Sequence, residues 1–151
     1  VAVNRPDAAS VRAAVETMQG RLGTFGALRF LVQKFLPGGL ELIVGAAAER
    51  GLGHLVMFGL GGIYVEVLKD VAFKIAPVTR VEAGEMLSSL KTRALLDGVR
   101  GGKGVDKERV VDLILRVSAL LGDLPEIREM DLNPILAFPD AAYAVDGRIR
   151  I

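Results

Sequence analysis

The stretch VQKFLPGGLELIVG, residues 32–45, predicts two strands separated by a sharp turn. Its first part ends an apolar run over residues 28–36, which is typical of a strand. Pro37-Gly38-Gly39 then breaks that run. The second run, residues 41–47, is almost wholly apolar, as expected for a strand that is buried on both faces of a sheet.

Outward from this stretch, strands and helices follow in mixed order. Short apolar runs predict strands over residues 55–58, 63–68, 71–75, 127–133 and 143–151. A loop that bears Pro134 and Pro139 should join the last two. Apolar side chains three and four residues apart predict helices over residues 8–19, 82–90 and 92–96, and a longer one from Asp106 to Gly122. Asp7 should cap the first helix and Gly20 should end it. This order favours a mixed α/β or α+β fold over a helical bundle.

The composition fits one packed domain and excludes several classes of function. A chain of 151 residues, 51% of them hydrophobic, can bury a core. The 19 basic and 18 acidic residues leave a net charge of +1, so a nucleic acid partner is not expected. The absence of cysteine excludes a thiol nucleophile and fits the cytoplasm. No apolar stretch could span a membrane, and the start of the chain predicts the interior of a longer protein.

Two glycine clusters could bring backbone amides close to an anion. One is FGLGG, residues 58–62, between two apolar runs, and the other is a basic loop over residues 98–104. The first lacks a dinucleotide fingerprint because Tyr64 stands where glycine is needed, and the second lacks the Ser or Thr of a P-loop after Lys103. An ordinary tight turn explains either cluster as well.

Residues 129–134, EMDLNP, predict a row of oxygen ligands on one face of a strand. Alternation along a strand puts Glu129, Asp131 and Asn133 on the same face. If the last strand pairs antiparallel with this one, Asp146 comes close to Asn133. Carboxylate and amide oxygens on adjacent strands suit Mg²⁺, which completes its coordination with waters and phosphate oxygens. The alternative is the polar outer face of a half-exposed sheet.

Glu41 and His54 are two further candidate functional residues that belong to neither of the patterns above. Glu41 could accept hydrogen bonds from hydroxyl donors, or it is a solvated acid that follows a turn. His54 is the single histidine, and it has no acidic neighbour closer along the chain than Glu49. A catalytic role for this histidine is therefore not expected.

Five segments, in this order, resemble one protein family. They are residues 32–45 (VQKFLPGGLELIVG), 56–70 (VMFGLGGIYVEVLKD), 76–77 (AP), 96–101 (LDGVRG) and 125–134 (PEIREMDLNP). Together they resemble the ATP-grasp domain of the ADP-forming (NDP-forming) acyl-CoA synthetases, as in acetyl-CoA synthetase beta subunits, and more distantly the beta subunit of succinyl-CoA synthetase. The resemblance implies an α+β, ATP-grasp fold, with residues 1–36 as a remnant of the small lobe and residues 37–151 as the large lobe.

The resemblance also implies roles for individual residues around bound ATP or ADP. The backbone of Gln33, Lys34, Phe35 and Leu36 would hold the adenine edge, and Glu41 the ribose hydroxyls. Gly61 and Gly62 would pass close to the phosphates, and Glu66 is a candidate catalytic residue that points toward them. Asn133 and Asp146 match the Mg²⁺ ligands, with Asp131 just behind them.

The activity implied is that of a cytoplasmic ligase, acyl-CoA + ADP + phosphate ⇌ carboxylic acid + ATP + CoA, with phosphoryl relay through a histidine. That histidine would belong to a CoA-binding, phosphohistidine domain or subunit that partners this one, so the 151-residue chain alone should be inactive. Residues 47–54 depart from the family pattern. This departure supports an alternative, a non-catalytic ATP-grasp remnant that senses nucleotide or joins subunits in a larger protein such as a fused acetyltransferase.

Overall fold

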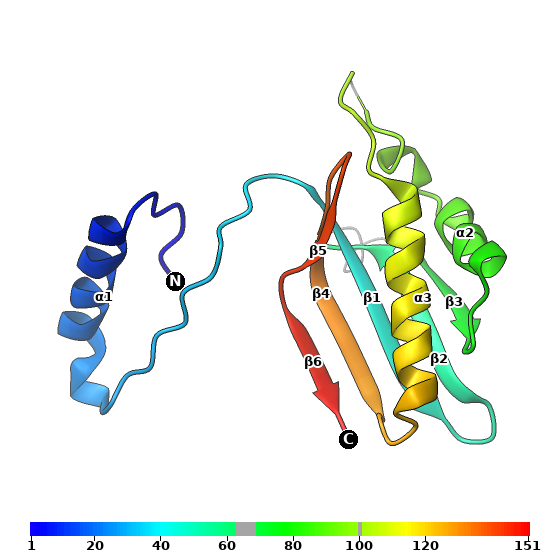
Figure 1. Ribbon diagram of the computed structural model, residues 1–151, viewed down its shortest axis with the longest axis horizontal. Helices are drawn as coiled ribbons and strands as arrows, with labels where there is room; N and C mark the ends of the chain where they lie inside the picture. Colours follow the sequence, from blue (N-terminus) through cyan, green and yellow to red (C-terminus); the bar gives the residue numbers. More distant parts are fainter. Residues whose placement is uncertain (63–68, 100) are drawn as a thin grey trace. The chain divides into compact units, whose positions relative to one another are not determined.

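The computed structural model describes residues 1–62, 69–99 and 101–151. The chain divides into two compact units, Val1–Pro37 and Gly38–Ile151. The regular elements of the first unit are helical, and the second contains an antiparallel sheet with helices against it (Figure 1). The described residues therefore form an α+β protein, as predicted.

In the first unit, α1 (Ala8–Leu22) begins where the sequence predicts. The Asp7 carboxylate accepts a hydrogen bond from the Ser10 backbone N–H at 2.7 Å, which satisfies one of the free amides of the first turn. The same carboxylate has a lowered pKa, because the backbone and side-chain hydrogen bonds from Ser10 favour its charged form. The predicted end was wrong. Gly20 keeps a negative φ and stays helical, and the helix ends before a 3₁₀ turn, η1 (Gly23–Phe25).

The strand predicted over residues 28–36 is also wrong. These residues belong to no helix or strand, and their backbone makes no hydrogen bond to the rest of the described chain. An apolar run becomes a strand only when another strand satisfies its N–H and C=O groups. The described residues of the first unit contain no second strand that could do so.

The second unit is built on one six-stranded sheet. Its members are β1 (Leu40–Glu49), β2 (Gly53–Leu60), β3 (Val71–Ile75), β4 (Glu129–Ala137), β5 (Ala142–Ala144) and β6 (Gly147–Arg150). The order is β3-β2-β1-β4-β5, with β6 paired to the other half of β4, and every pairing is antiparallel. The predicted strands over residues 41–47, 55–58 and 71–75 are confirmed, whereas residues 63–68 lie outside the described part.

The helical segments of the second unit, as far as it is described, follow β3 and precede β4 in the chain. They are α2 (Arg80–Ser89), η3 (Arg93–Leu95) and α3 (Lys107–Asp123). Figure 1 shows α2 and α3 against one face of the sheet. Asp106 caps α3 as predicted, through its carboxylate and the Arg109 N–H. A capping box of Thr79 and Glu82 starts α2 two residues before the predicted start. The segment over residues 92–96 is only a short 3₁₀ turn.

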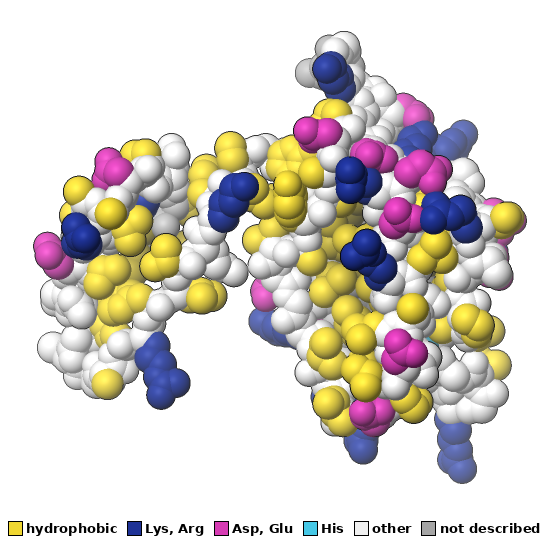
Figure 2. All heavy atoms as spheres, viewed as in Figure 1, with side chains coloured by type: hydrophobic (Ala, Val, Ile, Leu, Met, Phe, Trp, Pro, Cys, Tyr) yellow, Lys and Arg dark blue, Asp and Glu magenta, His cyan; other side chains and the backbone are white. Residues whose placement is uncertain are grey.

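The core lies between the sheet and these helices. Its fully buried members come from every layer: Leu42, Val44, Val56, Phe58, Leu60, Met86, Leu90, Leu96, Ile114, Leu121, Ile127 and Ile135. On the outer side of the helices, basic and acidic side chains mix (Figure 2). Arg80 there bonds to Glu108 at 2.9 Å and to Asp112 at 2.5 Å, so the α2–α3 pair is also bridged by exposed ion pairs. None of the described helices is both long and apolar enough to cross a bilayer.

Asp70 is buried, with 7% of its surface exposed, and fastens the start of β3 to the turn after α2. Its carboxylate accepts from the Lys91 N–H at 3.0 Å, from the Thr92 N–H at 2.8 Å and from the Thr92 hydroxyl at 2.5 Å. Burial acts to raise the pKa of this carboxyl, but the three hydrogen bonds outweigh it and lower the pKa below 3.8.

Asp70→Asn should therefore lower the free energy of unfolding by about 2–3 kcal/mol at neutral pH, because an amide NH₂ replaces one acceptor oxygen. A lowered folded-state pKa stabilises the fold fully above the unfolded value of 3.8, and the effect is lost as pH falls through the folded value. Urea unfolding at several pH values should show the gap between variant and parent closing in acid. A difference in the free energy of unfolding that stayed the same at every pH would contradict a stabilising role for the Asp70 charge.

Candidate functional site

The candidate residues of the second unit share one face of the sheet. Along β1, Leu42, Val44 and Ala46 point to the helices and are buried in the core. Alternation then places Glu41 and Gly45 on the opposite side, which we call the open face. Asp131 pairs with Gly45, so it lies on the open face too.

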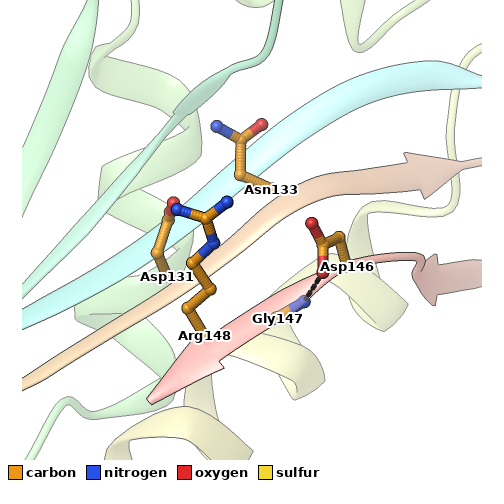
Figure 3. A pocket seen from close by; sticks show the side chains of 5 residues that line it. All are labelled: Asp131, Asn133, Asp146, Gly147 and Arg148. Atoms are coloured by element: carbon orange, nitrogen blue, oxygen red, sulfur yellow. Dashed lines mark hydrogen bonds between the residues drawn. The ribbon is translucent and has the colours of Figure 1, made fainter. Parts of the chain in front are cut away.

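Asn133 and Asp146 come together as the sequence predicts. The β4 and β6 strands pair antiparallel, and the Asn133 N–H donates to the Asp146 backbone C=O at 3.2 Å. Both residues line a cavity of about 190 Å³, together with Asp131, Gly147 and Arg148 (Figure 3). The predicted juxtaposition is therefore present, whereas the role of these residues as metal ligands remains a prediction.

A β-bulge in β4 shapes this cavity. Val44 pairs with Leu132 and Leu42 with Ile135, so Ile43 alone faces both Asn133 and Pro134. The extra residue shifts the alternation by one, which returns Ile135 to the core although Asp131 and Asn133 lie on the open face. The loop predicted from Pro134 onward was wrong, because β4 continues beyond the bulge to Ala137.

The final predicted strand is split opposite the same bulge. The predicted run over residues 143–151 forms β5 and β6, which lie end to end along β4. Pro134 has no N–H to give, and its carbonyl accepts from Val145 instead. The break leaves Asp146 outside both strands, with its carboxylate over the cavity (Figure 3).

The carboxylate and amide oxygens that line the cavity suit a hard, hydrated cation. Asp131 and Asn133 make no side-chain hydrogen bond to the described residues, from which the Asp146 carboxylate accepts only the Gly147 N–H, at 2.9 Å. These oxygens suit Mg²⁺. The described part of the chain contains no cluster of three or more His, Cys, Asp or Glu that could hold a metal. The set is therefore incomplete without waters or the oxygens of a ligand.

Arg148 is a residue of this cavity that the sequence prediction missed. It follows Asp146 by two residues, on the strand that faces Asp131. The alternation of Asp146, Arg148 and Arg150 was visible in the sequence, but nothing along the chain separated one arginine from the other. Only the strand register shows which of the two reaches the cavity.

A wider groove of about 890 Å³ continues from this cavity across the open face. Small residues, Gly45 and Ala47, form its floor. One side is apolar, with Leu55, Met57 and Phe73, and the other carries Glu129, Asp131, Arg148 and Arg150. The charged side of the groove runs into the cavity.

Glu41 lies beside the glycine pair. The Gly61 N–H donates to the Glu41 backbone C=O at 2.7 Å, which extends the β1–β2 ladder by one step. Gly62 has a φ of +62°, and a Cβ added to it would stand 2.9 Å from Glu41 Oε2. A larger residue at position 62 would thus be strained and would press on the Glu41 carboxylate. The predicted approach of Gly61 and Gly62 to phosphates stays a prediction.

The other candidates are placed only in part. Residues 33–36 belong to the first unit, where Gln33, Lys34 and Phe35 are exposed and Leu36 is half-buried. Glu66 lies outside the described residues. The ring nitrogen Nε2 of His54 lies 2.7 Å from the Ile127 carbonyl oxygen, to which it donates, and this hydrogen bond joins the start of β2 to the segment before β4.

Across residues 1–151 the chain matches the model of the ATP-grasp domain family. It is 47% identical over 135 residues to acetate–CoA ligase (ADP-forming) I of Archaeoglobus fulgidus, a match that covers 89% of this chain and 20% of that protein. It is 48% identical over 119 residues to the beta subunit of acetate–CoA ligase (ADP-forming) I of Pyrococcus furiosus, over 79% of this chain and 51% of that subunit.

Among solved structures, the chain is similar to acetyl-coenzyme A synthetase 1 of Ca. Korarchaeum cryptofilum in complex with coenzyme A and Mg-AMPPCP. The TM-score is 0.87 at 38% identity, over 98% of this chain and 66% of that chain. The phosphohistidine segment of that protein points towards its nucleotide binding site. The chain thus spans about half or less of the two curated relatives, and about two thirds of this structural one.

Proposed function

Because this chain belongs to the ATP-grasp domain family, we propose that it is the nucleotide-binding part of an ADP-forming acyl-CoA synthetase. The proposed reaction is acyl-CoA + ADP + phosphate ⇌ carboxylic acid + ATP + CoA, with acetyl-CoA as the first substrate to test. The observation that supports it best is the cavity that brings Asp131, Asn133 and Asp146 together on the open face. The relatives at 47% and 48% identity carry the names of ligases of this type.

Each candidate residue has a role in this proposal. Asn133 and Asp146 would hold Mg²⁺, with Asp131 next to them, and the ion would supply positive charge to the phosphates when bound. Glu41 would accept hydrogen bonds from the two ribose hydroxyls. Backbone groups of residues 33–36 would hold the adenine edge, and the amides of Gly61 and Gly62 would lie near the phosphates. Glu66 stays a candidate catalytic residue.

The partner in this proposal is a CoA-binding, phosphohistidine domain or subunit of the same enzyme, and the location is the cytoplasm. Support comes from the relatives: one is named as a beta subunit, and the structural relative has a phosphohistidine segment that points towards its nucleotide site. The non-catalytic alternative is not favoured, because the curated relatives carry the names of enzymes.

The test is a coupled assay of ATP formation by the whole polypeptide to which this chain belongs. With acetyl-CoA, ADP, phosphate and Mg²⁺ present, we expect ATP to form, and omission of any one of the four should abolish its formation. A second arm measures Mg²⁺-dependent nucleotide binding without acyl-CoA. Binding without turnover on any acyl-CoA would favour the sensing alternative, and the absence of both would overturn the proposal.

A further inference from the structure

Two arginines of β6, Arg148 and Arg150, have equivalent positions in the strand pairing but different side-chain contacts. Strand pairing places Arg148 opposite Asp131 and Arg150 opposite Glu129, so each arginine has an acid directly across the ladder. Arg150 Nη2 bonds to Glu129 Oε1 at 2.5 Å. Arg148 forms no hydrogen bond or ion pair with any residue that the structure describes. Only one of the two pairs is therefore closed.

The open pair is the one in the cavity. Figure 3 shows the guanidinium of Arg148 on the same side of the sheet as the side chains of Asp131 and Asn133, and all three line the cavity together with Asp146. The Arg148 guanidinium and the Asp131 carboxylate do not bond to each other across the ladder. They can therefore both take part in binding a ligand that carries negative charge on one side and a metal cation on the other. A metal-bound phosphate is such a ligand, because some of its oxygens bind the cation and the rest keep negative charge.

We propose that Arg148 binds oxygens of a phosphoryl group that occupies this cavity together with Mg²⁺. This inference rests on the proposed function and names a further residue for it. The planar fork of arginine matches two phosphate oxygens. The Asp131 carboxylate, which pairs with none of the described residues, would then lie on the metal side. The phosphoryl group is either the terminal phosphate of the nucleotide or one that arrives separately, as inorganic phosphate.

The test uses Arg148→Gln in the whole polypeptide, with Arg148→Lys as the variant that keeps the charge but loses the fork. Arg150→Gln is the matched control, because it removes an arginine from the same strand and the same face. Calorimetric titration in excess Mg²⁺ measures the Kd of AMPPCP and of ADP, and steady-state kinetics in the direction of ATP formation gives the KM for phosphate.

We expect Arg148→Gln to raise the Kd of AMPPCP about tenfold or more and to change the Kd of ADP by about threefold or less. The Kd of AMPPCP for Arg148→Lys should lie between those of the parent and of Arg148→Gln. Both Kd values for Arg150→Gln should match those of the parent. Unchanged nucleotide affinities with a KM for phosphate raised about tenfold would support the separate phosphoryl group as the ligand.

Two results would overturn the inference. One is an equal loss of affinity for both nucleotides, which a general loss of charge or structure would produce. The other is no change in the Kd of AMPPCP, in the Kd of ADP or in the KM for phosphate. Failure of the proposed function is distinct from both, because the parent protein itself would then bind no nucleotide in a Mg²⁺-dependent way, and the inference would fall with it.

Discussion

Asp146→Asn should raise the Mg²⁺ concentration for half-maximal activity by roughly 10- to 100-fold while the fold stays intact. The residue sits between β5 and β6, where its backbone C=O already accepts from Asn133, so the amide side chain needs no rearrangement of the sheet. The substitution keeps one oxygen over the cavity and removes the negative charge that attracts a hydrated cation. Activity measured against free Mg²⁺ at constant nucleotide gives the shift.

Asp140→Asn is the control for charge alone. Asp140 is exposed in the turn between β4 and β5, outside the residues that line the cavity, and its replacement changes the net charge by the same amount. We expect it to leave the Mg²⁺ dependence unchanged. If Asp146→Asn kept the parent's dependence, or if a nucleotide-bound structure placed the ion away from both Asn133 and Asp146, the metal assignment would have to be abandoned.

Local patterns were enough to predict most of the second unit. The apolar run over residues 41–47 is a strand with most of its side chains buried in the sheet, and the run over residues 71–75 is an edge strand that pairs with β2. The periodic face of α3 supplies its buried side chains, and the carboxylate of Asp106 starts it. The proximity of Asn133 and Asp146 followed from alternation and an assumed antiparallel pairing, and β4 and β6 do pair in that way.

Three of the features that the sequence did not predict share a physical cause, which is that they depend on contacts between distant residues. The run over residues 28–36 has the composition of a strand, yet no described strand is available to pair with it in its unit. The bulge at Asn133 and Pro134 is a property of the β1–β4 register, and no pattern within β4 alone reveals it. The distinction between Arg148 and Arg150 depends on which acid each can reach across the ladder.

Glu41→Ala should weaken ATP binding by about 1.5–3 kcal/mol, or about 10- to 150-fold, because two hydroxyl donors lose a charged acceptor. The structure supports this role through the position of the side chain at the start of β1, on the open face. Its Oε2 lies close over Gly62, and the Gly61 N–H holds its backbone. Among the described residues, no donor bonds to this carboxylate.

The sharper measurement compares ATP with 2′-deoxy-ATP, because lost affinity alone would also follow from a disturbed strand. The parent should prefer ATP, and Glu41→Ala should bind the two nucleotides nearly alike, since the acceptor that distinguishes them is gone. Glu49→Ala, at the far end of the same strand and outside the cavity, should keep the full preference. If Glu41→Ala also kept it, the ribose would have another partner, and Glu41 would serve only to position the glycine pair.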